Sequence, residues 1–388
     1  MTVHLTVLDL LPRSSGDDDA TVLANARSLA VAVEAAGYRR LWFAEHHLNP
    51  GVLGSSPAVT IALVGPVTSR IRLGSAGVQI GHRTPLATVE EFGLLAAAFG
   101  GRLDLGIGRS PSRPAPDTEQ PGGPSHALGR APARHTTETR TANGLLLPAP
   151  YTPGPGTLAR LRATLDLLQQ PGAWAPPYDE QLDEVVALLE GSVTDAEGRR
   201  LTAAPGEGAD VDLWVLGASA GTSASVAGAR GLPFVASYHH SPATVVDAVE
   251  AYRAAFRPSE KRAAPYVAVS VDAVAAPTSA EAQRLAAGYG PWVRSIRAGE
   301  GAIPYPSDAE VPALRLGDED AALVDDRVRT QLLGDPGEVA DRLEQVVGAT
   351  GADEIAITTM THAHADRVRS YELIAAEWAR RGHAAPTA

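Results

Sequence analysis

The sequence predicts one α/β domain over residues 1–388, folded as a single closed (β/α)8 TIM barrel with a long insertion at about residues 111–208. Strand-like and helix-like segments alternate along the chain, which is typical of a parallel sheet covered by helices. Eight such units can be counted, which favours a closed barrel over an open sheet. The length of 388 residues also suits one barrel with insertions, because such barrels run from about 200 to over 400 residues.

The first four units are regular. Pro85 at the start and the Gly100-Gly101 pair at the end delimit the third helix, because proline suits the first helical position and glycine the position after the last. Another helix is expected after Pro57. The remaining elements of this half are strands at 3–10, 40–44, 71–78 and 102–107 and helices at 21–36 and 85–99.

The segment from Pro111 to about Pro155 breaks this rhythm, because it is rich in Pro, Gly, Ser, Thr and Ala and shows little periodicity. Two amphipathic helices are predicted after it, at 158–168 and 179–189. Loops longer than about 12 to 15 residues without regular structure are usually functional lids or disordered linkers. We expect the insertion to determine substrate specificity, with a plain linker as the alternative.

The alternation resumes after the insertion and continues to the C-terminal region. Helices are predicted at 219–230, 242–256 and 363–381, and strands at 212–216, 233–237, 266–272 and 354–358.

Composition excludes several kinds of protein. The formal charge of −12 argues against nucleic-acid and anionic-membrane partners, which both require a basic surface. The chain has no cysteine, so a thiolate nucleophile, a disulfide framework and a cysteine-based metal site are all excluded. No stretch approaches the 18 to 20 or so apolar residues that cross a bilayer, and the N-terminus lacks the features of a signal peptide. We expect a soluble cytoplasmic protein.

Histidines follow three of the predicted strands: His46 and His47 after the second, His239 and His240 after the sixth, and His362 and His364 after the eighth. Barrel active sites form at the carboxyl ends of the strands, so the positions of these histidines indicate a catalytic or ligand-binding role. A histidine there can also be a structural residue that forms hydrogen bonds and fills space at the end of the barrel.

A metal-dependent hydrolase is one alternative, because His362 and His364 have a metal-ligand spacing. Barrel hydrolases, however, generally place such a pair after the first strand, where this chain has Leu10-Leu11-Pro12-Arg13, and many need a lysine after the fourth. The only lysine is Lys261. We therefore expect no metal.

Two further segments indicate a ligand. Small and hydroxyl residues from Gly217 to Ala224 lie between a strand and a helix, where free backbone amides and the helix dipole favour a phosphate, although such residues also cap helices. Arg109, after the fourth strand, would add a guanidinium at the same rim. The small residues from Gly74 to Gly77 would let a flat ligand approach the backbone, or would mark a bulge.

Together these residues resemble the luciferase-like flavin-dependent monooxygenases over nearly the whole chain except about residues 111–200. The resemblance rests on the order and spacing of five segments: 37–47 with its Glu45-His46-His47, 72–80, 101–110, 217–234 and 366–373. It implies that His46 is the active-site histidine beside the flavin and that Ala76-Gly77 carries a non-proline cis peptide against the flavin ring.

The resemblance also assigns the phosphate contacts to Arg109, Ser219, Ala220, Thr222 and Ser223. Two departures stand out. Gly108 replaces a cysteine of bacterial luciferase, so thiol reactivity is lost, and Ala220 replaces a hydroxyl residue, so its contact can only be through the backbone.

The implied reaction is transfer of one oxygen atom from dioxygen to an organic substrate, with reduced FMN delivered as a cosubstrate by a separate flavin reductase. The absence of a Gly-x-Gly-x-x-Gly fingerprint after a strand agrees with the absence of a bound nicotinamide. Members of the family pair through the helices after strands two and three, so a homodimer is expected. A deazaflavin-dependent oxidoreductase on the same barrel and a non-catalytic flavin-binding protein are the other readings.

Overall fold

The computed structural model describes residues 2–110, 112–113 and 131–383. Its centre is a closed barrel, because β9 pairs with β10 and β12 pairs with β1, and all the ladders around the ring are parallel. The prediction of a (β/α)8 barrel is confirmed. The eight strands are β1 (His4–Asp9), β2 (Arg40–Phe43), β3 (Arg72–Ser75), β5 (Leu103–Gly108), β8 (Val211–Gly217), β9 (Phe234–Ser237), β10 (Val267–Ala275) and β12 (Glu354–Thr358).

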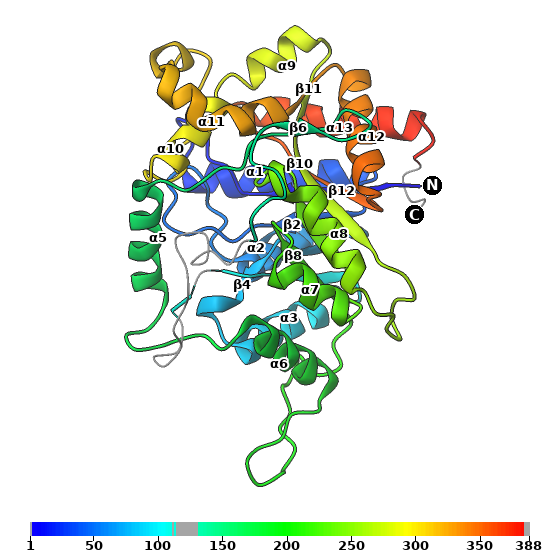
Figure 1. Cartoon of the computed structure of the whole chain (residues 1–388). Coiled ribbons are helices and arrows are strands. Elements are labelled where there is room, and N and C mark those ends of the chain that lie inside the picture. The colour runs from blue at the N-terminus through cyan, green and yellow to red at the C-terminus, as the bar shows by residue number, and fades with distance from the viewer. Residues whose placement is uncertain (1, 111, 114–130, 384–388) are drawn as a thin grey trace.

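A ring of helices covers the outside of the barrel (Figure 1). Several begin at side-chain caps, such as Asp18, whose carboxylate accepts from the Thr21 amide, and Thr84, whose hydroxyl accepts from the Ala87 amide. The ring helices are α1 (Asp19–Ala35), α2 (Pro57–Val64), α3 (Pro85–Phe99), α6 (Tyr178–Glu190), α7 (Thr222–Ala229), α8 (Val245–Ala255), α12 (Pro336–Thr350) and α13 (His364–Arg380).

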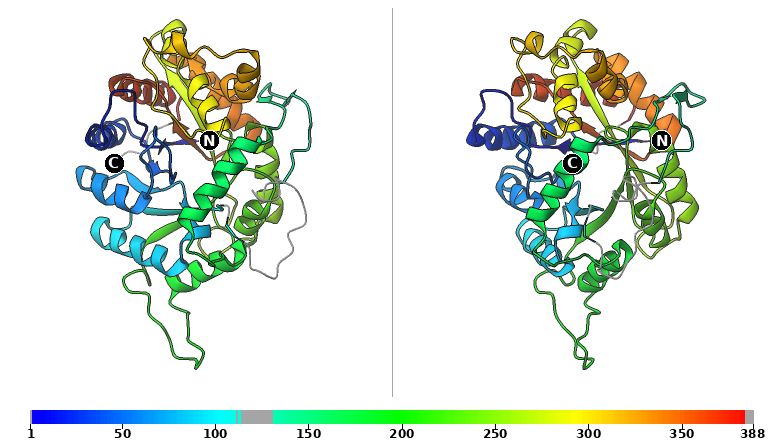
Figure 2. Two further views of the ribbon diagram at one scale, coloured as in Figure 1. Left: turned by 90° about the vertical axis from the view of Figure 1, so that its left-hand side faces the viewer. Right: turned by 60° about the vertical axis from the view of Figure 1, so that its left-hand side comes forward.

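The segment between β5 and β8 contains both predicted amphipathic helices, α5 (Pro155–Leu168) and α6. Helix α6 packs against α3 and α7 and is therefore the fourth helix of the ring. It lies within the segment that was predicted to be an insertion. Helix α5 instead crosses the mouth of the barrel (Figure 2, left). A small hairpin of β6 (Thr139–Arg140) and β7 (Leu146–Leu147) precedes it. Residues 111 and 114–130 of the predicted excursion lie outside the described residues, and the extent of the domain and its insertion stays a prediction.

A second insertion, which the sequence analysis missed, follows β10. Helix α11 was overlooked because it is acidic and mostly exposed. The Asp335-to-Glu338 capping box, in contrast, is a signal that could have located α12. The insertion contains α9 (Ser279–Leu285), α10 (Tyr289–Arg297), η4 (Val311–Leu314), α11 (Asp318–Thr330) and β11 (Leu332–Gly334).

One predicted strand is interrupted. The strand expected at 71–78 ends as β3 at Ser75, and a cis peptide joins Ala76 to Gly77 before β4 (Val78–Gln79) begins. Strand β4 then pairs with β5, so the chain leaves the ladder at the small residues and rejoins it afterwards. Three short 3₁₀ helices complete the elements: η1 (Gly65–Val67), η2 (Ile80–His82) and η3 (Pro242–Thr244).

The amino-terminal end of the barrel is filled by a buried ionic network. Arg40 donates to both carboxylate oxygens of Asp104 at 2.7 Å and to Glu354 at 3.1 Å, and its guanidinium lies 4.8 Å from the centre of the Trp214 ring. Trp42 also donates to Asp104, at 2.9 Å. Because this end is closed, the open space of the barrel lies at the carboxyl end of the strands. Within the described residues, no helix is both long and apolar enough to span a membrane.

Candidate active site

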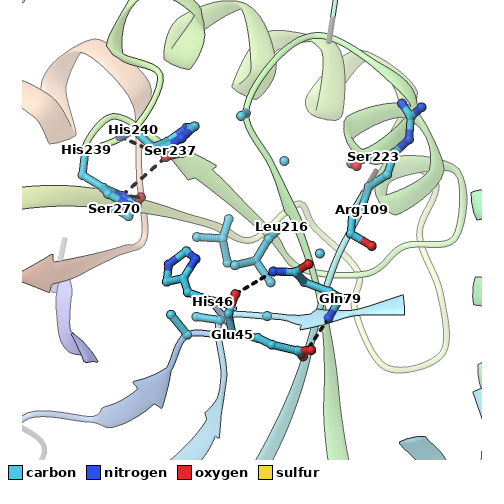
Figure 3. A pocket seen from close by; sticks show the side chains of 18 of the residues that line it. Glu45, His46, Gln79, Arg109, Leu216, Ser223, Ser237, His239, His240 and Ser270 are labelled. Atoms are coloured by element: carbon cyan, nitrogen blue, oxygen red, sulfur yellow. Dashed lines mark hydrogen bonds between the residues drawn. The ribbon is translucent and has the colours of Figure 1, made fainter. Parts of the chain in front are cut away.

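A cavity of about 490 Å³ lies at the carboxyl end of the barrel. Its walls come from the residues that follow β2, β3, β5, β8 and β9, together with α5 and part of the second insertion. Figure 3 shows His46 and His239 on one side of this cavity and Arg109 and Ser223 on the other. The cavity therefore joins segments that are far apart in the sequence.

His46 lies in the loop after β2, and its backbone amide donates to the Gly54 carbonyl at 2.6 Å. Its ring is exposed to the cavity, and within the described residues no group forms a hydrogen bond with it. The pKa of His46 is lowered even though its ring opens on the cavity, because the surrounding barrel keeps much of the bulk water away from the ring and so disfavours its charged form, and the neighbouring His47 adds to this effect. A neutral imidazole at this position is suited to accept a proton from a ligand in the cavity.

The carboxylate of Glu45 lies beneath His46 and is the centre of a hydrogen-bond network. His47 and His82 contact its Oε1 at 2.9 and 3.0 Å, and the Gln79 amide donates to Oε2 at 3.0 Å. Burial alone would raise the pKa of Glu45, but the bonds from His47, His82 and the Gln79 amide outweigh it and hold that pKa at about 2. Glu45 is therefore ionised. Neither Gln79 nor His82 was predicted as a site residue from the sequence.

Glu45, His47 and His82 are also close enough together to hold a metal ion, because one ligand atom from each lies within 4.8 Å of the others. Hydrogen bonds between these atoms already satisfy them. The structure does not bring His362 and His364 to the described wall of the cavity. The ring of His362 instead lies 3.1 Å from the Ser15 carbonyl, at the loop after β1.

Ala76 and Gly77 line the cavity between β3 and β4, at the cis peptide that the resemblance implied. The Ala76 amide donates to the Phe43 carbonyl at 2.8 Å, which fixes this turn against β2. A Cβ on Gly77 would lie 2.7 Å from the Gly106 carbonyl oxygen, so no other residue fits there without a shift of the backbone.

The loop from β8 to α7 forms the opposite wall. Helix α7 begins at Thr222, not at Ser219 as predicted, because Gly221 is its N-cap, and Ser219 and Ala220 lie in the loop before it. Within the described residues no side chain caps this helix, so its first amides have no side-chain acceptor. Ser219, Thr222 and Ser223 line the cavity, but Ala220 is not part of the described lining.

Arg109 follows β5 and is exposed at the cavity, where its side chain extends beside Ser223 (Figure 3). Its guanidinium and the start of α7 thus present hydrogen-bond donors to the same space. Such a set of a guanidinium, hydroxyls and open amides is suited to a phosphate.

His239 and His240 follow β9 and also line the cavity. The Nδ1 atom of His239 lies 2.7 Å from the Ser270 hydroxyl. Burial lowers the pKa of His239 to about 3, and the nearby Arg327 and His46 add to the effect, so this ring is neutral.

Helix α5 contributes a face that the sequence analysis did not assign to the site. Thr157, Arg160, Leu161 and Thr164 line the cavity at the spacing of one helix face. That i, i+3, i+4, i+7 spacing was readable in the sequence, but nothing in it showed which surface the face would cover. Ile296 and Gly301, from the second insertion, complete this part of the wall.

Comparison with known families agrees with this geometry. The family model described as luciferase-like monooxygenase matches residues 4–135 and 175–354. The chain belongs to the luciferase-like monooxygenase family. It is therefore an oxidoreductase. The internal segment that the family model leaves unmatched, residues 136–174, contains α5 and the β6–β7 hairpin.

Individual relatives cover nearly the whole chain. The uncharacterized protein YvbT of Bacillus subtilis is 34% identical over 380 residues, which are 97% of each chain. The crystal structure of apo-MsnO8 is 28% identical, covers 97% of this chain and 98% of its own, and has a TM-score of 0.75.

Two more distant structures share the fold alone and differ in cofactor. The oxygenating constituent of 3,6-diketocamphane monooxygenase from Pseudomonas putida, in complex with FMN, is 20% identical with a TM-score of 0.56, over 98% of this chain and 99% of its own. An F420-dependent secondary alcohol dehydrogenase is 13% identical with a TM-score of 0.57, over 96% of this chain and 98% of its own. The fold is therefore compatible with either FMN or a deazaflavin as the cofactor.

Proposed function

We propose that the protein is a monooxygenase that takes reduced FMN from a separate flavin reductase and uses dioxygen to oxygenate a small organic molecule. The observation that carries the proposal is a single cavity lined by His46, by the Ala76-Gly77 pair and by the donors around Arg109 and the start of α7.

The residues present fit FMN. Arg109 and the hydroxyls of Ser219, Thr222 and Ser223 are donors suited to a terminal phosphate, and the contact of Ala220 would be through its backbone. Space for the rest of the molecule is left at Gly108, since a Cβ there would meet nothing closer than 3.9 Å. Ala76 and Gly77 are the residues that we assign to the face of the flavin ring.

Reduced FMN, when bound, would supply the electrons that activate dioxygen. The chain's own part is to hold and enclose the reactants. Arg109 would anchor the phosphate, and the neutral ring of His46 could take up or return a proton in the cavity. The buried network at Arg40 closes one end of the barrel and α5 crosses part of the other, which limits the access of bulk water to the cavity.

The homodimer belongs to the same proposal. Helices α2 and α3 expose apolar side chains, with Val59 58%, Leu63 37%, Leu86 43% and Leu94 63% exposed. Helix α2 carries no charged residue. A surface of this kind is suited to burial against a second copy.

The test is an anaerobic titration of the purified protein with reduced FMN and, separately, with reduced F420, followed by admission of dioxygen. We expect reduced FMN to bind and Arg109→Ala to weaken its binding by about 1.5 to 3 kcal/mol, the value of a charge-assisted contact. Oxidation of the bound flavin should then differ in rate from that of free flavin. Binding of F420 but not of FMN would support the deazaflavin alternative, and binding of neither would remove the proposal.

A further inference from the structure

The charges on the described wall of the cavity are unequal. Two guanidinium groups, Arg109 and Arg160, line it, but the only carboxylate among the described lining residues is that of Glu45. Glu45 is 2% exposed, and its oxygens are engaged by His47, His82 and the Gln79 amide. Its charge is therefore engaged below the surface of the cavity and does not neutralise Arg160.

Arg160 lies on a different side of the cavity from the proposed phosphate site. It extends from α5 and donates to the carbonyl of Leu48, in the loop after β2. It also packs on Gly301, where a Cβ would collide with the guanidinium. Arg109, in contrast, lies beside Ser223 at the loops after β5 and β8 (Figure 3).

The guanidinium of Arg160 retains unused hydrogen-bonding capacity. An arginine has five N–H donors, and the bond to Leu48 uses one of them. Within the described residues, no carboxylate lies within ion-pair distance of Arg160. Two polar side chains that line the same part of the cavity are already paired: the Asn49 side chain bonds to the His47 carbonyl and the Ala302 amide, and the Thr157 hydroxyl donates to the Arg297 carbonyl.

FMN carries one terminal phosphate, which the donors at Arg109 and α7 would satisfy. A second guanidinium elsewhere on the wall is therefore available for another anion. We propose that the organic substrate carries a carboxylate, which Arg160 binds beside α5. This inference rests on the proposed function and specifies the substrate class of the same cavity. The planar fork of arginine suits a carboxylate because it can donate two parallel hydrogen bonds.

The test compares acids with the corresponding alcohols. Octanoate and 1-octanol, and benzoate and benzyl alcohol, are titrated into the protein with and without oxidised FMN, by calorimetry. We expect the acid of at least one pair to bind about tenfold or more tightly than its alcohol, as one charge-assisted contact allows. Arg160→Met should remove that difference and leave alcohol and FMN binding within a few-fold, whereas Arg160→Lys should retain part of it.

Arg162→Met is the matched control, because Arg162 lies on the same helix but is exposed and outside the described lining of the cavity. It should leave acid binding unchanged. Equal affinity for acid and alcohol in both pairs, or no acid binding at all, would overturn the inference. Equal weakening of acid and alcohol by Arg160→Met would do the same, because it would assign the residue to the packing of α5. If FMN fails to bind but the Arg160-dependent preference for acid over alcohol persists, the result would contradict the proposed function and still support the carboxylate site.

Discussion

Gln79 donates two hydrogen bonds to Glu45, one from its backbone to the Glu45 side chain and one from its side chain to the Glu45 backbone. The Gln79 backbone amide donates to the Glu45 carboxylate at 3.0 Å, and the Gln79 side chain donates to the Glu45 backbone carbonyl at 2.7 Å. The pair joins the loop after β2 to β4, on either side of the cis peptide at Ala76. The backbone of His46, which follows Glu45, is therefore fixed from a neighbouring strand.

This arrangement predicts a pH-dependent contribution to stability. The pKa of Glu45 falls from its usual 4.5 to about 2 on folding, so the carboxylate stabilises the fold fully above pH 4.5 and loses that effect as the pH falls through about 2. Glu45→Gln should lower the free energy of unfolding by about 1 to 3 kcal/mol at neutral pH. Urea unfolding from pH 7 to pH 2 should show that deficit shrinking with acid.

The matched control is Glu91→Gln. Glu91 pairs with Arg83 at 2.7 Å, but its side chain is 38% exposed, so its loss should change stability by less than about 1 kcal/mol at every pH. A deficit of constant size in Glu45→Gln would show that the carboxylate charge is not what stabilises this network.

His46→Ala should affect the reaction more than binding. Product formation is expected to fall by roughly 10² to 10⁴, the usual effect of removing a positioned acid or base, while FMN affinity stays within a few-fold. His240→Ala is the comparison, because His240 lines the same cavity after another strand. Steady-state kinetics and flavin titration of both variants separate the roles, and near-normal turnover in His46→Ala would leave that residue a structural one.

The pH profile gives a second, independent prediction for His46. Burial lowers the pKa of this ring from 6.5, so its neutral form persists below that pH and is lost only as the pH falls through the lowered value. We expect kcat/KM to decline on the acid side below pH 6.5 and His46→Ala to lack that decline. His239, with a pKa of about 3, should not contribute between pH 5 and 8. If kcat/KM still declines at acid pH in His46→Ala, the decline must be due to the protonation of another group.

Gly108→Val should block the proposed flavin site without unfolding the barrel. A Cβ at Gly108 meets only the carbonyl oxygens of Gly77 and Val78, at 3.9 Å, so a larger side chain would project into the cavity. FMN binding should weaken by about tenfold or more, while the melting temperature hardly changes. Gly106→Ala is the contrasting variant, since its Cβ would collide with the Ser75 carbonyl and should destabilise the protein. Unchanged FMN affinity in Gly108→Val would show that FMN does not bind beside Gly108.

The proposed dimer is tested by Leu94→Glu. Leu94 is 63% exposed on α3, and a charge there should convert the dimer to a monomer in analytical ultracentrifugation. Leu167→Glu makes the same change on α5, where the side chain is 73% exposed, and should leave the oligomeric state unchanged. A native protein that sediments as a monomer would contradict the proposal directly.

The sequence indicated the barrel because its strands are short apolar segments between clear turn signals, as at Arg40 to Phe43. It indicated the position of His46 at the cavity because a strand end fixes where the following residues lie, whereas the role of His46 came from the family resemblance and stays a prediction. It could not indicate Gln79 and His82 as partners of Glu45, because their contacts depend on how β4 rejoins the sheet after the cis peptide. Arg160 was missed for a related reason, since the periodicity of α5 defines a face but not what that face covers.

Helix α5 has no fully buried residue, in contrast to each of the eight helices of the ring. The hydrophobic free energy that holds the barrel together is therefore contributed almost entirely by other elements. A lineage could replace the residues of α5, and with them the shape of the cavity roof, at little cost to folding. This is the physical basis on which one barrel, with the proposed flavin-binding groups unchanged, could be adapted to new substrates one side chain at a time.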